Sequence, residues 1–223
     1  MNTKAPTPNA SEQVQKHHLP SVDSSVPLEQ GGPIARTGFD YQDHVAVGFL
    51  LEMLGNPELE KVHCETQDDI VLVWCGSGEK LRTAEYVQVK SDLPDQLWST
   101  SKLCQRHKGK VGSSIFEKSL ERDRCKEPSL FRICTQREPN SALSCLTHEF
   151  CDPRRATDTD EVKALVGDLE KKCGTSSSKK GNGAAFWVQN CKWDYTESMG
   201  SLEARNVTRV LELASNEPLP VPL

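Results

Sequence analysis

Three residues of the sequence could together carry out metal-assisted hydrolysis: Asp69, Gln88 and Lys90. Asp69 opens an apolar run that ends at Trp74, and Gln88 and Lys90 close a second apolar run that begins at Ala84. Two such runs, separated by the glycine-containing segment CGSGEK, are typical of a β-hairpin. Because the start of one hairpin strand lies beside the end of the other, we expect the carboxylate, the amide and the ammonium group to converge at one end of a sheet.

This set of side chains matches what a hard cation and a reacting phosphate group need. Magnesium binds oxygen ligands and usually takes only one or two carboxylates, which leaves positions for water and a phosphate oxygen. Such an ion lowers the pKa of bound water, and a neighbouring lysine can orient that water and offset developing negative charge. Asp69 and Lys90 supply the minimum, with Glu65 expected as the second carboxylate and Glu52 as the alternative. In a regular strand the side chain of Asp68 points to the opposite face from Asp69, so we interpret it as a turn residue.

The elements that must position these residues alternate between helix and strand, so the sequence predicts an α/β fold. The core is expected in the order helix, three strands, helix and strand, followed by additional C-terminal helices and a strand. The expected bounds are a helix over 40–54, strands over 61–66, 69–74 and 84–90, a serine-capped helix within SSIFEKSLERDR, a strand SLFRICTQ, a helix over 160–172, a strand FWVQNCKW and a helix over 202–214. Because the first helix is apolar around most of its circumference, we expect it to be largely buried.

The 223 residues are enough for one sizeable domain with flexible ends. Residues 1–30 are rich in proline and polar residues and predict a disordered leader, residues 31–214 form the expected domain, and residues 215–223 resemble the start of a linker to a further C-terminal region. The sequence contains no run of about 18 apolar residues that would predict a membrane span. The N-terminus lacks the apolar segment of a signal peptide, so we expect a cytoplasmic protein without membrane partners.

Nine cysteines without a secretory signal predict reduced thiols. Structural zinc sites use closely spaced pairs such as CxxC, and the sequence has no such pair. The nearest cluster is Cys145, His148 and Cys151 in the segment CLTHEFC. We therefore interpret the cysteines as scattered structural residues, with zinc at this cluster as the alternative.

The predicted order of elements, with the pattern D-x(18)-QxK across the hairpin, resembles the PD-(D/E)xK restriction-endonuclease-like superfamily. Within it, the segments GGPIARTGFDYQ, ETQDDI and YVQVKS resemble the nuclease domain of bacterial anti-phage effectors. These effectors include double-stranded-DNA endonucleases associated with CD-NTase signalling (CBASS) and some STAND-type defence proteins. The resemblance covers residues 31–136 with specific motifs and is loose over the remainder.

The resemblance implies magnesium-dependent hydrolysis of phosphodiester bonds in double-stranded DNA, with manganese as a substitute for magnesium. It assigns the motif aspartate to Asp69 and the motif lysine to Lys90, while Gln88 stands where the superfamily usually has an acidic residue. The expected metal ligands are therefore Asp69, Gln88 or a backbone carbonyl near it, and Glu65. Gln42 could contact this site or the DNA backbone, or act only as a cap or packing residue.

The chain has a net charge of −5, yet binding to DNA requires only local positive charge. Residues 102–126 contain eight lysines or arginines and three acidic residues. Arg106, Lys108 and Lys110 lie there in the polar segment RHKGKVG. We expect them to contact DNA, with a solvated surface as the alternative.

Together these patterns predict an endonuclease domain that cleaves double-stranded DNA as the effector of a bacterial defence system. The same reasoning predicts activation by self-association through a sensor or oligomerisation region of a longer protein. The alternative class is a catalytically silent nucleic-acid-binding or assembly module on the same scaffold.

Overall fold

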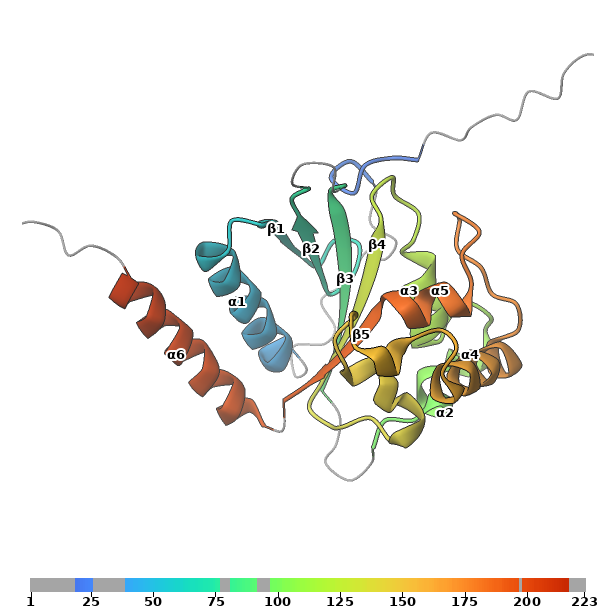
Figure 1. Cartoon of the computed structure of the whole chain (residues 1–223). Helices are drawn as coiled ribbons and strands as arrows, with labels where there is room; N and C mark the ends of the chain where they lie inside the picture. Colours follow the sequence, from blue (N-terminus) through green and yellow to red (C-terminus); the bar gives the residue numbers. More distant parts are fainter. Residues whose placement is uncertain (1–18, 26–38, 77–80, 92–96, 197, 217–223) are drawn as a thin grey trace, which may run out of the picture.

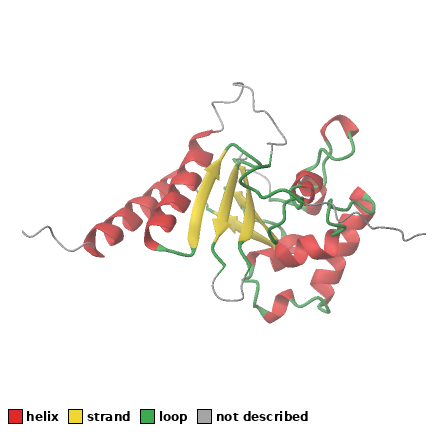
Figure 2. Cartoon of the chain, turned by 90° about the horizontal axis from the view of Figure 1, so that it is seen from above, coloured by secondary structure: helices red, strands yellow, loops and turns green. Residues whose placement is uncertain are grey.

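The computed structural model describes residues 19–25, 39–76, 81–91, 97–196 and 198–216. At the centre is a five-stranded sheet in the order β1-β2-β3-β4-β5. Its first three strands are antiparallel and its last two extend it in parallel, with the bounds β1 Leu59–Cys64, β2 Ile70–Trp74, β3 Thr83–Lys90, β4 Ser129–Thr135 and β5 Cys191–Tyr195. Helices cover both faces of the sheet (Figure 1 and Figure 2), which confirms the predicted restriction-endonuclease-like α/β class.

One face of the sheet is covered by α1 (Phe39–Gly55), and α6 (Met199–Asn216) lies alongside α1 (Figure 1). Two glycines of α1 allow the two helices to approach closely. A Cβ atom added at Gly48 would lie 3.1 Å from Oδ1 of Asn206, and one at Gly55 would lie 3.2 Å from the side chain of Leu213.

The prediction that α1 is largely buried is wrong. Its apolar residues surround the helix, but only the sides that face the sheet and α6 are covered, and Tyr41, Val45 and Phe49 are buried there. Val47 is 41 % exposed and Leu54 is 72 % exposed, because neither the sheet nor α6 covers the remaining side.

The opposite face of the sheet carries the larger core. Its helices are α2 (Thr100–Leu103), α3 (Ile115–Glu121), α4 (Asp160–Cys173) and α5 (Ala184–Asn190). Phe116 of α3 and Trp187 of α5 meet edge to face, with ring centroids 5.2 Å apart, above Phe131 of β4. A capping box between Ser114 and Glu117 begins α3, as the serine in the sequence predicted.

The segment FWVQNCKW is not the single strand that was predicted. Residues Ala184–Asn190 form helix α5, and strand β5 begins only at Cys191. Ala184, Trp187 and Val188 are buried, and this spacing of three and four residues places them on one helical face. The aromatic and β-branched residues were interpreted as a strand, but packing against α3 and β4 favours a helix here.

Residues 19–25 belong to the segment expected to be a disordered leader, and this expectation does not hold for them. Val22 is 5 % exposed and packs in the larger core. The buried carboxylate of Glu127 accepts hydrogen bonds from the Ser21 hydroxyl (2.9 Å) and the Val22 backbone amide (3.2 Å). The other residues of the expected leader, residues 77–80 and residues 217–223 of the linker expected over 215–223 lie outside the described residues.

Within the described ranges, no helix combines the length and the apolar character needed to cross a membrane.

Candidate active site at the end of the β2–β3 hairpin

Asp69, Gln88 and Lys90 meet at one end of the β2–β3 hairpin, as the sequence pattern predicts. The antiparallel register pairs Ile70 with Val87, so the residue before β2 lies opposite Gln88. Oδ2 of Asp69 accepts hydrogen bonds from Nε2 of Gln88 (2.9 Å) and from the backbone amide of Val89 (2.7 Å), and lies 3.5 Å from Nζ of Lys90.

This cluster is open to solvent on one side. The Lys90 and Asp69 side chains are 34 % and 23 % exposed, whereas Gln88 is buried. Lys90 and Asp69 form an ion pair in which Nζ and Oδ2 lie 3.5 Å apart, which is too far for a tight hydrogen bond. Either charged group can therefore bind a ligand in place of its contact with the other. The buried amide of Gln88 meanwhile holds the Asp69 carboxylate in its orientation.

Glu65 begins the bend over residues 65–69 that carries Asp69 into β2. Its backbone has a left-handed φ of 55°, and its amide donates to the carbonyl of Asp69 at 3.0 Å, which closes the bend. Gln42 of α1 donates a hydrogen bond from Nε2 to Oε1 of Glu65. The structure thus places both predicted residues at the bend that holds Asp69.

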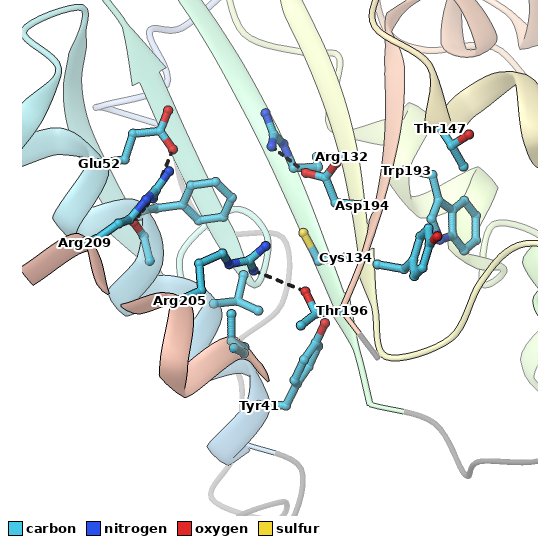
Figure 3. Close-up of a pocket in the computed structure, with 15 residues that line it drawn as sticks. Tyr41, Glu52, Arg132, Cys134, Thr147, Trp193, Asp194, Thr196, Arg205 and Arg209 are labelled. Atoms are coloured by element: carbon cyan, nitrogen blue, oxygen red, sulfur yellow. Dashed lines mark hydrogen bonds and ion pairs between the residues drawn. The ribbon is translucent and has the colours of Figure 1, made fainter. Parts of the chain in front are cut away.

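Glu52, the alternative second carboxylate, lies elsewhere. Its Oε2 atom is 3.7 Å from Nη1 of Arg209, and Glu52 lines a cavity of about 340 Å³ between α1, α6 and strands β4 and β5 (Figure 3). Arg132, Asp194 and Arg205 line the same cavity. The residues that line it do not include the Asp69–Lys90 cluster.

Asp68 lies in the bend, but it is not merely a turn residue on a surface. Its side chain is 2 % exposed, and its Oδ2 atom is 3.5 Å from Nε of the equally buried Arg122. Burial raises the pKa of Asp68 to about 7, although the charge of Arg122 acts in the opposite direction. Sequence reasoning missed this partner, because no local pattern connects a residue after α3 with the β1–β2 bend.

The three predicted DNA contacts have different environments. Arg106 binds the carboxylate of Glu117 through Nε (2.9 Å) and Nη2 (2.5 Å) and also donates to the carbonyl of Cys173. Although burial alone raises the pKa of Glu117, hydrogen bonds from Arg106 and Ser114 lower it to about 2. Lys108 and Lys110 are exposed beside this pair, so they present their charges to solvent.

The donor groups at the hairpin are oxygen atoms, which suit magnesium or manganese better than zinc. Within the described ranges, no group of three or more His, Cys, Asp or Glu side chains is arranged to hold a metal ion. Cys145, His148 and Cys151 therefore do not form the alternative zinc site. The hairpin offers carboxylate and amide oxygens from Asp69, Glu65 and Gln88, and magnesium typically takes one or two carboxylates and completes its shell with water. All three described contacts of the Asp69 carboxylate involve Oδ2.

A mixed sheet between two layers of helices, with an aspartate, a glutamine and a lysine gathered at the end of one hairpin, defines a restriction-endonuclease-like nuclease domain. The family model of the Cap4 dsDNA endonuclease domain matches residues 30–216, and the chain belongs to this family. It is thus by family a double-stranded-DNA endonuclease domain, and the resemblance proposed from the motifs is confirmed.

Other comparisons found one curated relative and several solved structures that are similar to this chain. Anti-bacteriophage protein A of Escherichia coli (strain K12) is 29 % identical over 197 residues, which is 85 % of this chain and 34 % of that protein. The Cap4 SAVED/CARF-domain containing receptor of Acinetobacter baumannii, with the cyclic trinucleotide 3'3'3'-cAAA, matches 83 % of this chain and 37 % of its own at 19 % identity and a TM-score of 0.45. The corresponding receptor of Moraxella osloensis matches 83 % and 39 % at 15 % identity and a TM-score of 0.45. The chain therefore spans about a third of the length of the curated relative.

Proposed function

We propose that the domain hydrolyses phosphodiester bonds of duplex DNA with a divalent cation, magnesium by preference and manganese as a substitute. The observation that supports this proposal is the convergence of Asp69, Gln88 and Lys90, with Nζ of Lys90 3.5 Å from Oδ2 of Asp69 at a solvent-accessible sheet end. A bound cation would supply a water molecule of lowered pKa and would polarise a phosphoryl oxygen.

In this proposal each residue of the hairpin has a separate task. Hydrogen bonds from Gln88 and the Val89 amide fix Oδ2 of Asp69, which leaves Oδ1 to bind the cation. Because Nε2 of Gln88 donates to Asp69, its Oε1 atom is the part of that amide that can act as a ligand. Lys90 holds its ammonium group beside the carboxylate, where it can orient the attacking water and offset the negative charge that develops on the phosphate.

Glu65 is the proposed second carboxylate, because it lies in the same bend as Asp69 and is oriented by Gln42. Lys108 and Lys110 are the proposed contacts with the DNA backbone, since phosphate groups are bound by accessible cations. Arg106 is not a DNA contact in this proposal, because its guanidinium already binds Glu117.

The direct test is the degradation of supercoiled plasmid by the purified chain with magnesium and with EDTA. We expect cleavage only with the metal, and none from the Lys90→Ala variant in either condition. A catalytically silent DNA-binding or assembly module would instead retain plasmid binding and leave the plasmid intact with magnesium.

We further propose that the longer protein acts in the cytoplasm of a bacterium and that self-association activates this domain. One site with one lysine cleaves one strand per encounter, so a double-strand break requires two domains on the same duplex. Tethering raises the effective concentration of a second domain without any new contact at the site. Fusion to an inducible dimeriser should therefore increase the rate of plasmid linearisation, and equal rates with and without the inducer would contradict this proposal.

A further inference from the structure

The bend over residues 65–69 carries the proposed metal ligands Glu65 and Asp69, yet it lies outside both flanking strands. Its one described internal backbone hydrogen bond joins the Glu65 amide to the Asp69 carbonyl at 3.0 Å. Glu65 also has a left-handed φ of 55°, which costs free energy in a residue other than glycine. The geometry of Asp69 therefore depends on contacts that other parts of the molecule make with this bend.

Asp68 makes the most direct of these contacts. Its Oδ1 atom accepts a hydrogen bond from the backbone amide of Asp69 at 3.0 Å, while its Oδ2 atom lies 3.5 Å from Nε of Arg122. The Asp68 and Arg122 side chains are 2 % and 5 % exposed. One buried carboxylate thus connects the backbone of Asp69 to the end of α3.

Gln67 attaches the bend to the same region. Its Oε1 atom accepts a hydrogen bond from Arg124, and its Nε2 atom donates to the carbonyl of Ser25, both at 2.5 Å. Gln67 is 4 % exposed. The segment that follows α3 therefore contacts two consecutive residues of the bend, immediately before Asp69.

We propose that Asp68 and Arg122 are positioning residues, which hold Asp69 in the orientation that binds the divalent cation. This inference rests on the proposed function of the hairpin site. Neighbours that orient a metal ligand without touching the metal typically change metal affinity or activity about 10- to 100-fold when they are removed.

The chain provides a matched control beside Arg122. Asp123 is also fully buried, and it accepts hydrogen bonds from Ser178 and Asn182, both at 2.7 Å, and pairs with Lys180 at 2.9 Å. These partners belong to the loop before α5 and not to the 65–69 bend. Asp68→Asn and Asp123→Asn therefore each replace a buried carboxyl group by an amide, but only the first disturbs the support of Asp69.

The experiment measures manganese binding to the DNA-free chain by isothermal titration calorimetry, with thermal unfolding and plasmid cleavage measured on the same samples. We expect Asp68→Asn and Arg122→Ala to weaken manganese binding about 10- to 100-fold and to lower kcat more than they raise KM for DNA. Arg122→Lys retains the charge and should recover part of the affinity. Asp123→Asn should lower the melting temperature while the affinity for manganese remains that of the wild type.

Wild-type manganese affinity in folded Asp68→Asn protein would overturn the positioning role, as would equal weakening in Asp123→Asn. If Arg122→Ala fails to fold, the nearly isosteric Asp68→Asn variant and Arg122→Lys decide the question. A wild-type chain that neither binds manganese nor cleaves DNA would refute the proposed function itself. Failure confined to the Asp68 and Arg122 variants would refute only this inference.

Discussion

Strand β3 carries two charged clusters that differ in how their charges are satisfied. Near its start, Glu85 is 2 % exposed and accepts hydrogen bonds from Nε1 of Trp74 (2.9 Å) and Nε of Arg132 (2.6 Å). At its end, Lys90 and Asp69 are partly exposed and lie 3.5 Å apart. We call the cluster around Glu85 and Arg132 closed, because its charges are tightly hydrogen-bonded, and the cluster of Asp69 and Lys90 open.

The closed cluster is suited to structure. Burial alone lowers the pKa of Arg132, but the charges of Glu85 and Asp194 outweigh it and raise that pKa. Its guanidinium bonds both carboxylates at 2.6 Å, which is much closer than the 3.5 Å between Lys90 and Asp69. The ion pair between Lys90 and Asp69 lacks such a tight contact, and its two charged groups are partly exposed to solvent.

The largest expected effect is the loss of cleavage in Lys90→Ala. Removal of one group that stabilises developing charge typically costs about 100- to 1,000-fold in rate. The melting temperature should remain unchanged, because the Lys90 side chain is 34 % exposed and contributes little packing. Plasmid linearisation per unit time measures the effect, and Arg154→Ala, which alters an exposed ion pair with Asp152, is the control. Cleavage by Lys90→Ala at the wild-type rate would show that the open cluster does not act in cleavage.

Arg132→Ala should have the opposite consequence. The change leaves the carboxylate of Glu85 buried without its cation, and loss of one member of a buried pair costs about 3–5 kcal/mol. Urea unfolding followed by circular dichroism measures this loss. The cleavage rate of the protein that remains folded should stay close to that of the wild type. A stable Arg132→Ala protein without activity would show that the closed cluster also takes part in the chemistry.

Glu117 and Arg106 form another closed ion pair, and its contribution to stability depends on pH. The pKa of Glu117 falls from 4.5 to about 2 in the folded chain, which corresponds to about 3 kcal/mol of stability. Since the folded pKa is the lower one, this stability is complete above pH 4.5 and is lost as the pH falls towards 2. Urea unfolding should therefore show Glu117→Gln less stable than the wild type at pH 7, with the difference shrinking below pH 4.5. A difference that persists unchanged at pH 2 would contradict this assignment.

The smallest expected effect separates the two candidate second carboxylates. Glu65→Gln should lower the cleavage rate about tenfold, equivalent to about 1.4 kcal/mol, because Glu65 lies in the bend that holds Asp69. Glu52→Gln should have little effect, since its carboxylate pairs with Arg209 in the cavity beside α6. Plasmid assays of both variants at equal magnesium concentration measure the ranking. The reverse ranking would transfer the ligand role to α1.

The sequence by itself determined the hairpin and the three polar residues that meet at its end. Alternation along two short apolar runs defines strands, and their lengths and spacing set the register that places Asp69 opposite Gln88 and near Lys90. The sequence also predicted the serine cap of α3, because the hydrogen bonds of this cap connect residues only three positions apart. Such features depend on neighbours along the chain.

Only the tertiary structure decided which charged side chains are already paired. Glu52 meets Arg209 on the last helix, Arg106 meets Glu117, and Asp68 meets Arg122 after α3. Packing also decided that Ala184–Asn190 is a helix and that one side of α1 remains exposed. The physical reason is that the free energy of a charged or apolar side chain depends on which distant segments surround it, and neither local periodicity nor residue type specifies those segments.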